Sequence, residues 1–360
     1  MTRLQALHFP FAQGLVPKEP FQMRCAMRVV TFTVVGLLVG CSSSSTELQE
    51  LSRTAHSQEM LAASAPLPAT PPAAAEDKTF ALAIQPNDLK VMTFNLRVPF
   101  VLDGWNFWTF RRDLIVNTVE SFDPDLLGTQ ECPSSSADFL RAKLTAYEFV
   151  GVGRNDGKLR GEMCGMFFRR DRFTKLNEGH FWLSNTPNKA GSRSWGNGAP
   201  RMVSWVCLQP KDGSAAFCWF NTHFDNASSN ARNQSARLLR SAVKQISNGM
   251  PAVVTGDFNT DQHTEPYEML VGGRPGVDTD LYDAFRLANP IVNDNEGTMH
   301  NFHGGKNGPR IDWILTNAGF QPLDVTIDHT QRGPLFPSDH FPVKAIIRLN
   351  NTPTNFAKAE

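Results

Sequence analysis

The sequence lacks an excess of charge of either sign, because its 35 lysines and arginines equal its 35 aspartates and glutamates. Proteins that bind nucleic acid through their overall charge are usually basic, so no global field attracts a polyanion, although a local basic patch is not excluded. Charged residues are sparse at 19%, whereas hydrophobic residues reach 41%. This balance excludes an intrinsically disordered chain, and 360 residues are enough to bury a large globular core.

The apolar run near the N-terminus, VVTFTVVGLLVG, is too short to span a bilayer comfortably. It follows Met27 and Arg28, which is typical of a bacterial export signal. The run ends in LVGC, and these four residues resemble the lipobox, where a signal peptide is cut before a cysteine that becomes acylated. We therefore expect a signal peptide over residues 1–41 with lipidation at Cys41. The alternative is that Cys41 is an ordinary cysteine in a short membrane anchor.

Both interpretations imply export. An acylated Cys41 would attach the protein to the membrane of the bacterial cell envelope, the outer membrane if the source is Gram-negative; without it the chain would be periplasmic or extracellular. Residues 42–85 are rich in Ser, Pro and Ala without apolar periodicity, which indicates a disordered tether. Residues 86–350 carry the pattern of a folded domain, and residues 351–360 form a C-terminal tail.

Cysteine is scarce, with six in the chain. Cys207 and Cys218 flank the segment PKDG symmetrically, and an Asp-Gly turn would place them opposite each other on a hairpin. An exported protein permits disulfides, so the pair is either a cross-strand disulfide or two free thiols. Cys132 and Cys164 lie in apolar, strand-like stretches, where buried free thiols are expected.

Strand-like and helical patterns interleave along the domain. Helical periodicity covers residues 108–121, 134–144 and 228–246. Apolar runs rich in β-branched and aromatic residues predict at least eight strands: LKVMTFNLRV, DLLGTQE, GEMCGMFFRR, RMVSWVCLQ, AAFCWFNTHF, PAVVTGDFN, RIDWILT and PVKAIIRL. This order favours a mixed α/β architecture over a purely parallel one.

Many of these apolar runs end in a short polar cluster. The residues concerned are Asn95, Glu131, Asn221, His223, Asp257, Asn259, Asp312, Asp339 and His340. Buried polar and charged groups are costly unless they are paired or bound to a ligand, so convergence on one site is the economical explanation. Carboxylate and amide oxygens are hard ligands suited to Mg²⁺ or Mn²⁺, and such an ion implies a phosphate substrate.

The motifs FNLR, GTQE, NTHFD, TGDFN, RIDWI and SDHFP, in this order, resemble those of the endonuclease/exonuclease/phosphatase superfamily. The resemblance covers residues 89–348. It implies a four-layer α/β sandwich, in which two mixed β-sheets pack face to face with helices on the outside. It also implies Mg²⁺-dependent hydrolysis of a phosphate ester by activated water, without a covalent enzyme intermediate.

The resemblance assigns a role to each matching residue. Glu131 would be the main metal ligand, Asn95 would help to hold metal or phosphate, and Asp339 would be a second carboxylate of this site. Asp257 would orient or deprotonate the attacking water. Asn259 would bind a phosphate oxygen.

The two histidines and their partner complete the implied catalytic set. His340 would contact the scissile phosphate as acid or base, with Asp312 fixing its tautomer and orientation. His223 would stabilise the charge of the transition state or assist the leaving group.

Three further residues are expected on the substrate side. Asn221 would support the end of its strand. Arg112 stands with Arg111 in a Trp-x-x-Arg pattern that begins at Trp108, and Arg201 would grip a second phosphate or form a surface ion pair. The loop 98–107 is unusually aromatic. Its side chains would stack on bases, line a lipid-facing rim, or simply pack the loop, and packing is the default expectation.

The function predicted is that of an exported phosphodiesterase or phosphatase, expected as a monomer. A secreted nuclease that degrades DNA or RNA would use the same residues, and a non-catalytic binding module of the same fold is the third interpretation. The neutral charge favours a small phosphorylated molecule or a phospholipid head group as substrate over duplex DNA. Joint retention of the expected catalytic residues argues against the binding module.

Overall fold

The computed structural model describes residues 84–271 and 281–350. The predictions for the signal peptide, Cys41, residues 42–83 of the tether and the tail 351–360 lie outside these residues. Within the described ranges, none of the helices combines the length and the apolar character needed to cross a membrane.

The described strands form two mixed sheets of six strands each. The first sheet has the order β11-β12-β1-β2-β4-β3, and its strands are β1 (Asp88–Asn95), β2 (Leu126–Pro133), β3 (Tyr147–Val150), β4 (Glu162–Arg169), β11 (Phe320–Ile327) and β12 (Val343–Leu349). The second has the order β5-β6-β7-β8-β10-β9, and its strands are β5 (Phe173–Trp182), β6 (Met202–Pro210), β7 (Phe217–His223), β8 (Ala252–Asp257), β9 (Leu281–Asp283) and β10 (Asp312–Asn317).

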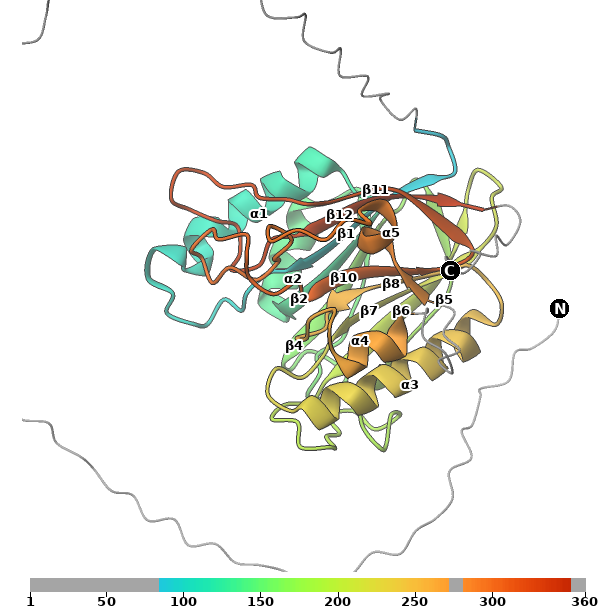
Figure 1. The fold of residues 1–360 in the computed structure, drawn as a ribbon, viewed down its shortest axis with the longest axis horizontal. Coiled ribbons are helices and arrows are strands. Elements are labelled where there is room, and N and C mark those ends of the chain that lie inside the picture. The colour runs from blue at the N-terminus through green and yellow to red at the C-terminus, as the bar shows by residue number, and fades with distance from the viewer. Residues whose placement is uncertain (1–83, 272–280, 351–360) are drawn as a thin grey trace, which may run out of the picture. The chain divides into compact units, whose positions relative to one another are not determined.

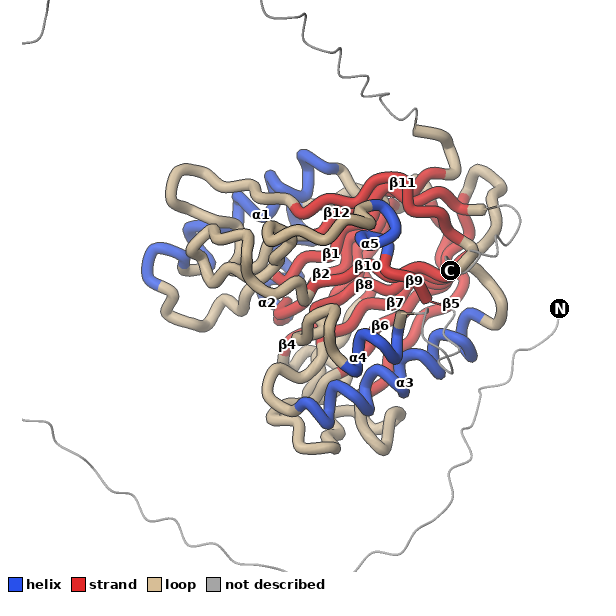
Figure 2. Tube along the Cα trace, in the orientation of Figure 1, coloured by secondary structure: helices blue, strands red, loops and turns tan. Residues whose placement is uncertain are grey.

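Helices cover the outer faces of the two sheets, as Figures 1 and 2 show. The apolar faces of α1 and α2 pack with β1, β2 and β4, while those of α3 and α4 pack with β6, β7, β8 and β10. The predicted four-layer sandwich is therefore confirmed. The helical elements are η1 (Gly104–Asn106), α1 (Trp108–Phe122), α2 (Ser134–Lys143), α3 (Ser229–Ser247), α4 (Glu265–Leu270) and α5 (Ala284–Ala288).

Strand alternation explains why the molecule has separate cores. In β1, Leu89 and Val91 lie in the core between the sheets, whereas Met92 and Phe94 lie in the core against α1 and α2. Successive side chains of a strand point to opposite faces, so a strand covered on both sides is apolar at nearly every position. This requirement accounts for the continuous apolar runs seen in the sequence.

Two parallel strand pairs set the position of the polar strand ends. β1 pairs in parallel with β2, and β7 pairs in parallel with β8. The carboxyl ends of parallel neighbours lie at the same edge of a sheet, which brings Asn95 beside β2 and His223 beside Asp257. The two sheets thus each present a polar edge at one end of the sandwich.

The cysteine pair left open by the sequence forms a disulfide. Cys207 and Cys218 are direct partners across β6 and β7, and their sulfur atoms are bonded. Both side chains lie in the apolar core beneath α3. Cys132 and Cys164 are buried free thiols, as expected.

Replacing both Cys207 and Cys218 by alanine is expected to lower the free energy of unfolding by about 2–3 kcal/mol, because the bond restricts the unfolded chain. Urea denaturation with and without dithiothreitol measures the effect. The wild-type chain should lose a similar amount on reduction, whereas the double variant should not respond. Equal stability of the two chains without reductant would contradict a stabilising disulfide.

Candidate active site

Three predicted residues form one row across the second sheet. Asp257, the last residue of β8, is the direct cross-strand partner of both His223 on β7 and Asp312 on β10. All three side chains are buried. The register alone therefore collects one imidazole and two carboxylates from three separate motifs.

The carboxylate of Asp257 lies at the centre of this row. Its Oδ1 accepts from the backbone N–H of Asn259 at 2.9 Å, and its Oδ2 accepts from Asn95 Nδ2 at 2.8 Å. Burial, reinforced by the nearby charge of Asp312, raises the pKa of Asp257 to about 7. A carboxyl group with such a pKa is suited to exchange a proton near neutral pH.

His340 and Asp312 form a buried hydrogen-bonded pair. His340 Nδ1 donates to Asp312 Oδ2 at 2.9 Å, which fixes the tautomer and the orientation of the ring. Burial alone would lower the pKa of His340, but the charges of Asp312 and Asp257 and the hydrogen bond raise it well above its usual value. A ring protonated on both nitrogens can donate from Nε2 as well as from Nδ1.

His223 has the opposite character. Burial, and then the charges of Arg201 and Arg154, hold the pKa of His223 well below its usual value. Asn259 Nδ2 donates to His223 Nε2 at 2.9 Å, so the neutral ring carries its proton on Nδ1. The charges of Asp312 and Asp257 thus raise the pKa of His340, whereas burial and the charges of Arg201 and Arg154 lower that of His223, although its Nε2 lies 3.5 Å from Asp257 Oδ2.

The first sheet contributes Asn95 and Glu131. Asn95 Nδ2 donates to Glu131 Oε1 at 3.1 Å, so the same amide joins Glu131 to Asp257 of the other sheet. The pairing of β2 with β4 shifts register between Thr129 and Cys132, and Glu131 adopts a positive φ of 52°. This bulge redirects the strand at the position that the sequence predicts as the main metal ligand.

Asp339 forms an ion pair with Arg97, a residue that was not among those predicted for the site. Arg97 Nη1 lies 3.4 Å from Asp339 Oδ2, and its other nitrogens bind Asp103 at 3.0 Å. Burial raises the pKa of Asp339, with Glu131 adding to the effect and His340 opposing it. The presence of Arg97 within the FNLR motif was the available signal.

Arg112 was expected on the substrate side, and the structure places it away from the site. Its guanidinium lies 4.8 Å from the ring of Phe139 on α2, so it packs between helices and does not contact the site. Arg111 is the buried one, and it donates to the carbonyl oxygens of Leu96, Arg97, Asn106 and Pro337. The spacing of Trp108, Arg111 and Ile115 places Arg111 on the inner helix face, which the sequence would have shown.

Asn221 was expected on the substrate side, and the structure corrects this. Its side chain is fully buried between the sheets, where Nδ2 donates to the carbonyl oxygens of Thr129 and Gly165 at 2.9 Å each. Its Oδ1 accepts from Gln130 Nε2 at 2.7 Å and from Thr255 Oγ1 at 3.1 Å. With these bonds made, Asn221 joins the sheets and has no surface for substrate.

Arg201 combines features of both interpretations that its sequence position allowed. It faces Asp225 at 3.5 Å and donates to Asn226 at 3.1 Å, so it is an ion-paired residue. It is also 6% exposed, and its Nη1 has no partner within the described part of the chain. A small cavity brings it together with Arg154 and His223, and an unused guanidinium nitrogen there suits an anion.

Two groups of residues have the chemistry to hold a divalent cation. Asp257, Asp312 and His340 offer ligand atoms within 4.8 Å of one another. Binding there would compete with the hydrogen bond between Asp312 and His340. Asn95, Glu131 and Asp339 form the second group. The carboxylate oxygens of Glu131 and Asp339 are hard ligands, whereas Asn95 turns its Nδ2 to Glu131 and its Oδ1 accepts from the backbone N–H of Arg97.

We favour the second group, Asn95, Glu131 and Asp339, because its occupation leaves the Asp312–His340 bond intact. The carboxylates of Glu131, Asp257 and Asp339 gather at this edge, and the buried Oδ1 of Asp312 has no partner among residues 84–271 and 281–350. The residues present therefore fit a divalent cation.

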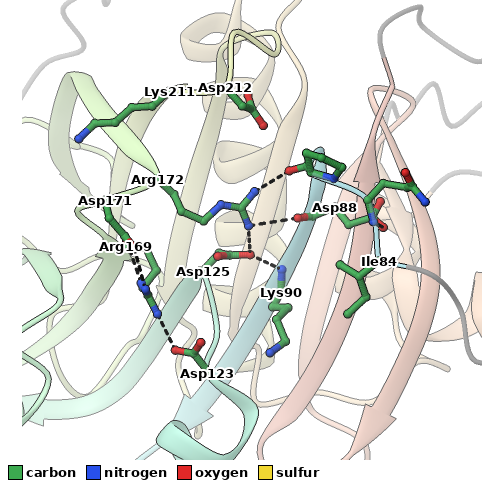
Figure 3. A pocket seen from close by; sticks show the side chains of 12 residues that line it. Ile84, Asp88, Lys90, Asp123, Asp125, Arg169, Asp171, Arg172, Lys211 and Asp212 are labelled. Atoms are coloured by element: carbon green, nitrogen blue, oxygen red, sulfur yellow. Dashed lines mark hydrogen bonds and ion pairs between the residues drawn. The ribbon is translucent and has the colours of Figure 1, made fainter.

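A second hollow lies at the other end of β1 and belongs to the scaffold. Figure 3 shows Arg172 bonded to Asp125 and to backbone oxygens, and Arg169 bonded to Asp123 and Asp171. Asp88, the first residue of β1, lines this hollow, whereas Asn95 ends the same strand at the catalytic edge. Its charges are largely used in ion pairs, so we assign it no catalysis.

Replacing Asp312 by asparagine is expected to lower kcat by about 10²- to 10⁴-fold with little change in KM, because His340 loses the partner that fixes its proton. Steady-state kinetics and the melting temperature of the purified variant measure the two effects. Full activity with an intact fold would contradict the assigned pair.

Replacing Asn221 by alanine is expected to affect stability and not kcat, the opposite of the Asp312 replacement. It is expected to lower the free energy of unfolding by about 2–4 kcal/mol, because two carbonyl groups and the amide of Gln130 lose their buried partners. The kcat of the folded fraction should stay near that of the wild type. A normal stability combined with a large loss of kcat would restore Asn221 to the substrate side.

Comparison with known proteins agrees with this geometry. The sequence pattern of the Endonuclease/Exonuclease/phosphatase family matches residues 92–340. The solved structure of a family member from Bacteroides vulgatus superposes with a TM-score of 0.68 at 31% identity, covering 73% of this chain and 99% of that one. A mannosyl-6-phosphatase from Bacteroides thetaiotaomicron gives a TM-score of 0.65 at 34% identity, covering 72% of this chain and 99% of its own.

An uncharacterized protein of Acanthamoeba polyphaga mimivirus is 29% identical over 161 residues, which make up 43% of this chain and 60% of the relative. The match thus spans less than two thirds of that relative. The family match itself runs through every motif from β1 to His340. Members of the family are phosphoric ester hydrolases and generally depend on a divalent metal, and this chain belongs to the Endonuclease/Exonuclease/phosphatase family.

Proposed function

We propose that the protein is a Mg²⁺-dependent hydrolase that cleaves phosphate esters of small phosphorylated molecules by means of an activated water. One observation carries the proposal. The proton-bearing His340 on Asp312 and the carboxylate of Asp257 lie in one buried edge with Asn95 and Glu131. A general acid, a general base and a hard-ligand group are thus held within one site.

The protonation states of Asp257 and His340 suggest the role of each side chain in the reaction. Asp257, with its pKa near 7, would take a proton from the attacking water. His340 would donate from Nε2 to an oxygen of the phosphate, while Asp312 holds its ring in place. Asn259 Nδ2, which donates to His223 Nε2, would also donate to a phosphate oxygen and so orient the substrate.

Glu131, Asn95 and Asp339 would hold the Mg²⁺ ion. When bound, the ion would neutralise phosphate oxygens and the charge that develops in the transition state. Arg97, paired with Asp339, would keep this carboxylate oriented before the ion binds.

The substrate class is proposed from similarity and charge. The mannosyl-6-phosphatase, at 34% identity, acts on a small phosphorylated sugar according to its name. The present chain has no net charge with which to attract long nucleic acids. Both points favour a small phosphorylated molecule or a lipid head group over DNA or RNA.

An exported location is part of the proposal. The Cys207–Cys218 disulfide suits an oxidising compartment, because disulfides persist there and are rare in the cytosol. The lipobox-like sequence that ends at Cys41 supports the same location. Acylation of Cys41 would then attach the protein to the cell envelope.

Replacing Asp257 or His340 by alanine is expected to abolish hydrolysis while leaving the fold intact, because both side chains serve the site. The assay uses the full chain carrying Cys41→Ser, with Mg²⁺ or EDTA. The substrates are mannose 6-phosphate, bis-p-nitrophenyl phosphate, sphingomyelin, single-stranded RNA and plasmid DNA.

Hydrolysis that EDTA abolishes and that is confined to the small esters supports the proposal. Cleavage of RNA or DNA would establish the nuclease instead. Unchanged turnover in either variant would overturn the catalytic assignment, and silence on every substrate would move weight to a binding module.

A further inference from the structure

Exposed apolar side chains gather in the segment between β1 and the first turns of α1. Leu102 is 90% exposed, Trp105 86%, Phe100 70%, Phe110 52% and Val101 39%. We call these five residues the apolar rim. The expectation that this loop packs its own aromatics is therefore wrong for the rim, whose side chains face solvent.

The rim is presented by a backbone that is firmly held. Arg97 binds Asp103 through two hydrogen bonds of 3.0 Å, and Arg111 donates to the carbonyl oxygen of Asn106 at 2.8 Å. The rings of Trp105 and Phe110 lie 6.2 Å apart. Exposed apolar side chains on a well-held loop are typical of a surface that binds a protein, a membrane or a ligand.

The same base is joined to the catalytic edge. The backbone N–H of Val98 donates to Glu131 Oε2 at 2.9 Å, and Arg97 lies 3.4 Å from Asp339. The rim thus borders the site, on the side of the residues that would hold the metal. Whatever covers the rim will lie next to the substrate.

We propose that the apolar rim docks the protein on a phospholipid bilayer, so that the site faces phosphate esters at the lipid surface. This inference rests on the proposed function and narrows its substrate class. Trp and Phe side chains favour the boundary between head groups and acyl chains, and interfacial binding grows with the apolar area inserted.

The N-terminal part of the chain supplies the reason to choose a membrane. An acylated Cys41 would hold the protein at a lipid surface, and 42 residues, 42 through 83, separate it from Ile84. Such a segment spans at most about 150 Å, whereas the eight residues of β1 span about 26 Å. The anchor therefore has the length to let the far end of β1 reach the same membrane.

A second contact is needed for that orientation. The chain enters the domain before Asp88, at the opposite end of β1 from Asn95 (Figure 1). The anchor alone would not direct the catalytic edge toward the lipid. The apolar rim lies at the catalytic end and would provide this second contact.

Vesicle flotation tests the proposal with residues 42–360, the part of the chain that follows the expected signal peptide and Cys41, so that neither the apolar run nor an acyl chain contributes. The vesicles contain phosphatidylethanolamine with a minority of phosphatidylglycerol. Leu102→Ser combined with Trp105→Ser is expected to weaken binding by about tenfold or more. Leu159→Ser combined with Ile291→Ser is the matched control, because these side chains are 69% and 82% exposed elsewhere.

Fluorescence provides an independent readout. Brominated lipids should quench part of the tryptophan emission, and Trp105→Phe should remove that part, since Trp105 is far more exposed than the other tryptophans. Binding should change little between low and high salt, because it is driven by apolar insertion and not by net charge.

Hydrolysis of a soluble ester by the same proteins separates the two claims. Normal hydrolysis without vesicle binding would overturn the docking proposal alone, whereas vesicle binding without hydrolysis would overturn the proposed function alone. Rim variants that convert a dimer to a monomer, with no vesicle binding by the parent chain, would show that a second copy covers the rim. Equal loss of binding in the control variant would also overturn the proposal.

Discussion

The side-chain amide of Asn95 holds the two halves of the site together, because it donates to Glu131 in the first sheet and to Asp257 in the second. The catalytic residues are divided between two sheets that share no strand. Their relative placement therefore depends on how closely the sheets approach at this edge. Ser338 helps to hold Asn95 in place, since its hydroxyl donates to the carbonyl oxygen of Asn95 at 2.6 Å.

Close approach of the sheets has a steric requirement behind the edge. A Cβ atom on Gly128 would lie 2.5 Å from Thr255 Oγ1 and 2.8 Å from Asn221 Oδ1, so only glycine fits there. The space it leaves admits the buried amide of Asn221, which bonds to backbone and side chains of both sheets. Buried hydrogen bonds of this kind favour one arrangement of the layers, because sliding the sheets would leave these polar groups without partners.

The sequence predicted the fold because apolar periodicity is a local pattern. The structure brings the polar residues at several strand ends together, and their roles stay predictions. Apolar runs ending in polar residues identified the strands and their catalytic ends, and the family motifs supplied the roles. Asn221 and Arg112 lie elsewhere than expected, for different reasons. Asn221 and His223 are two residues apart on β7 and share one face of the strand, but Asn221 is farther from the strand end and lies between the sheets. Arg111 and Arg112 are adjacent on α1 and therefore occupy different faces of the helix. Only the packed layers show that Asn221 points between the sheets.

Neighbouring charges explain why two buried histidines have pKa values shifted in opposite directions. His340 faces the carboxylates of Asp312 and Asp257, whereas His223 faces Arg201 and Arg154. Composition and spacing do not reveal such neighbours, because they come from distant segments of the chain. The sequence left open whether the loop 98–107 packs its aromatics or exposes them, because an aromatic loop has the same sequence pattern whether its rings turn inward or outward.

The position of the rim connects the scaffold to the substrate. Arg97 touches both Asp339 at the site and Asp103 at the base of the rim, and Arg111 ties the backbone of the same loop to Leu96 and Pro337. The loop that bears the rim is thus bonded, through Arg97 and Arg111, to the segments that carry Asn95 and Asp339. If the rim rests on a lipid surface, the same contacts that orient the protein would also steady its metal-binding residues. Docking and catalysis would then depend on one set of buried arginine contacts.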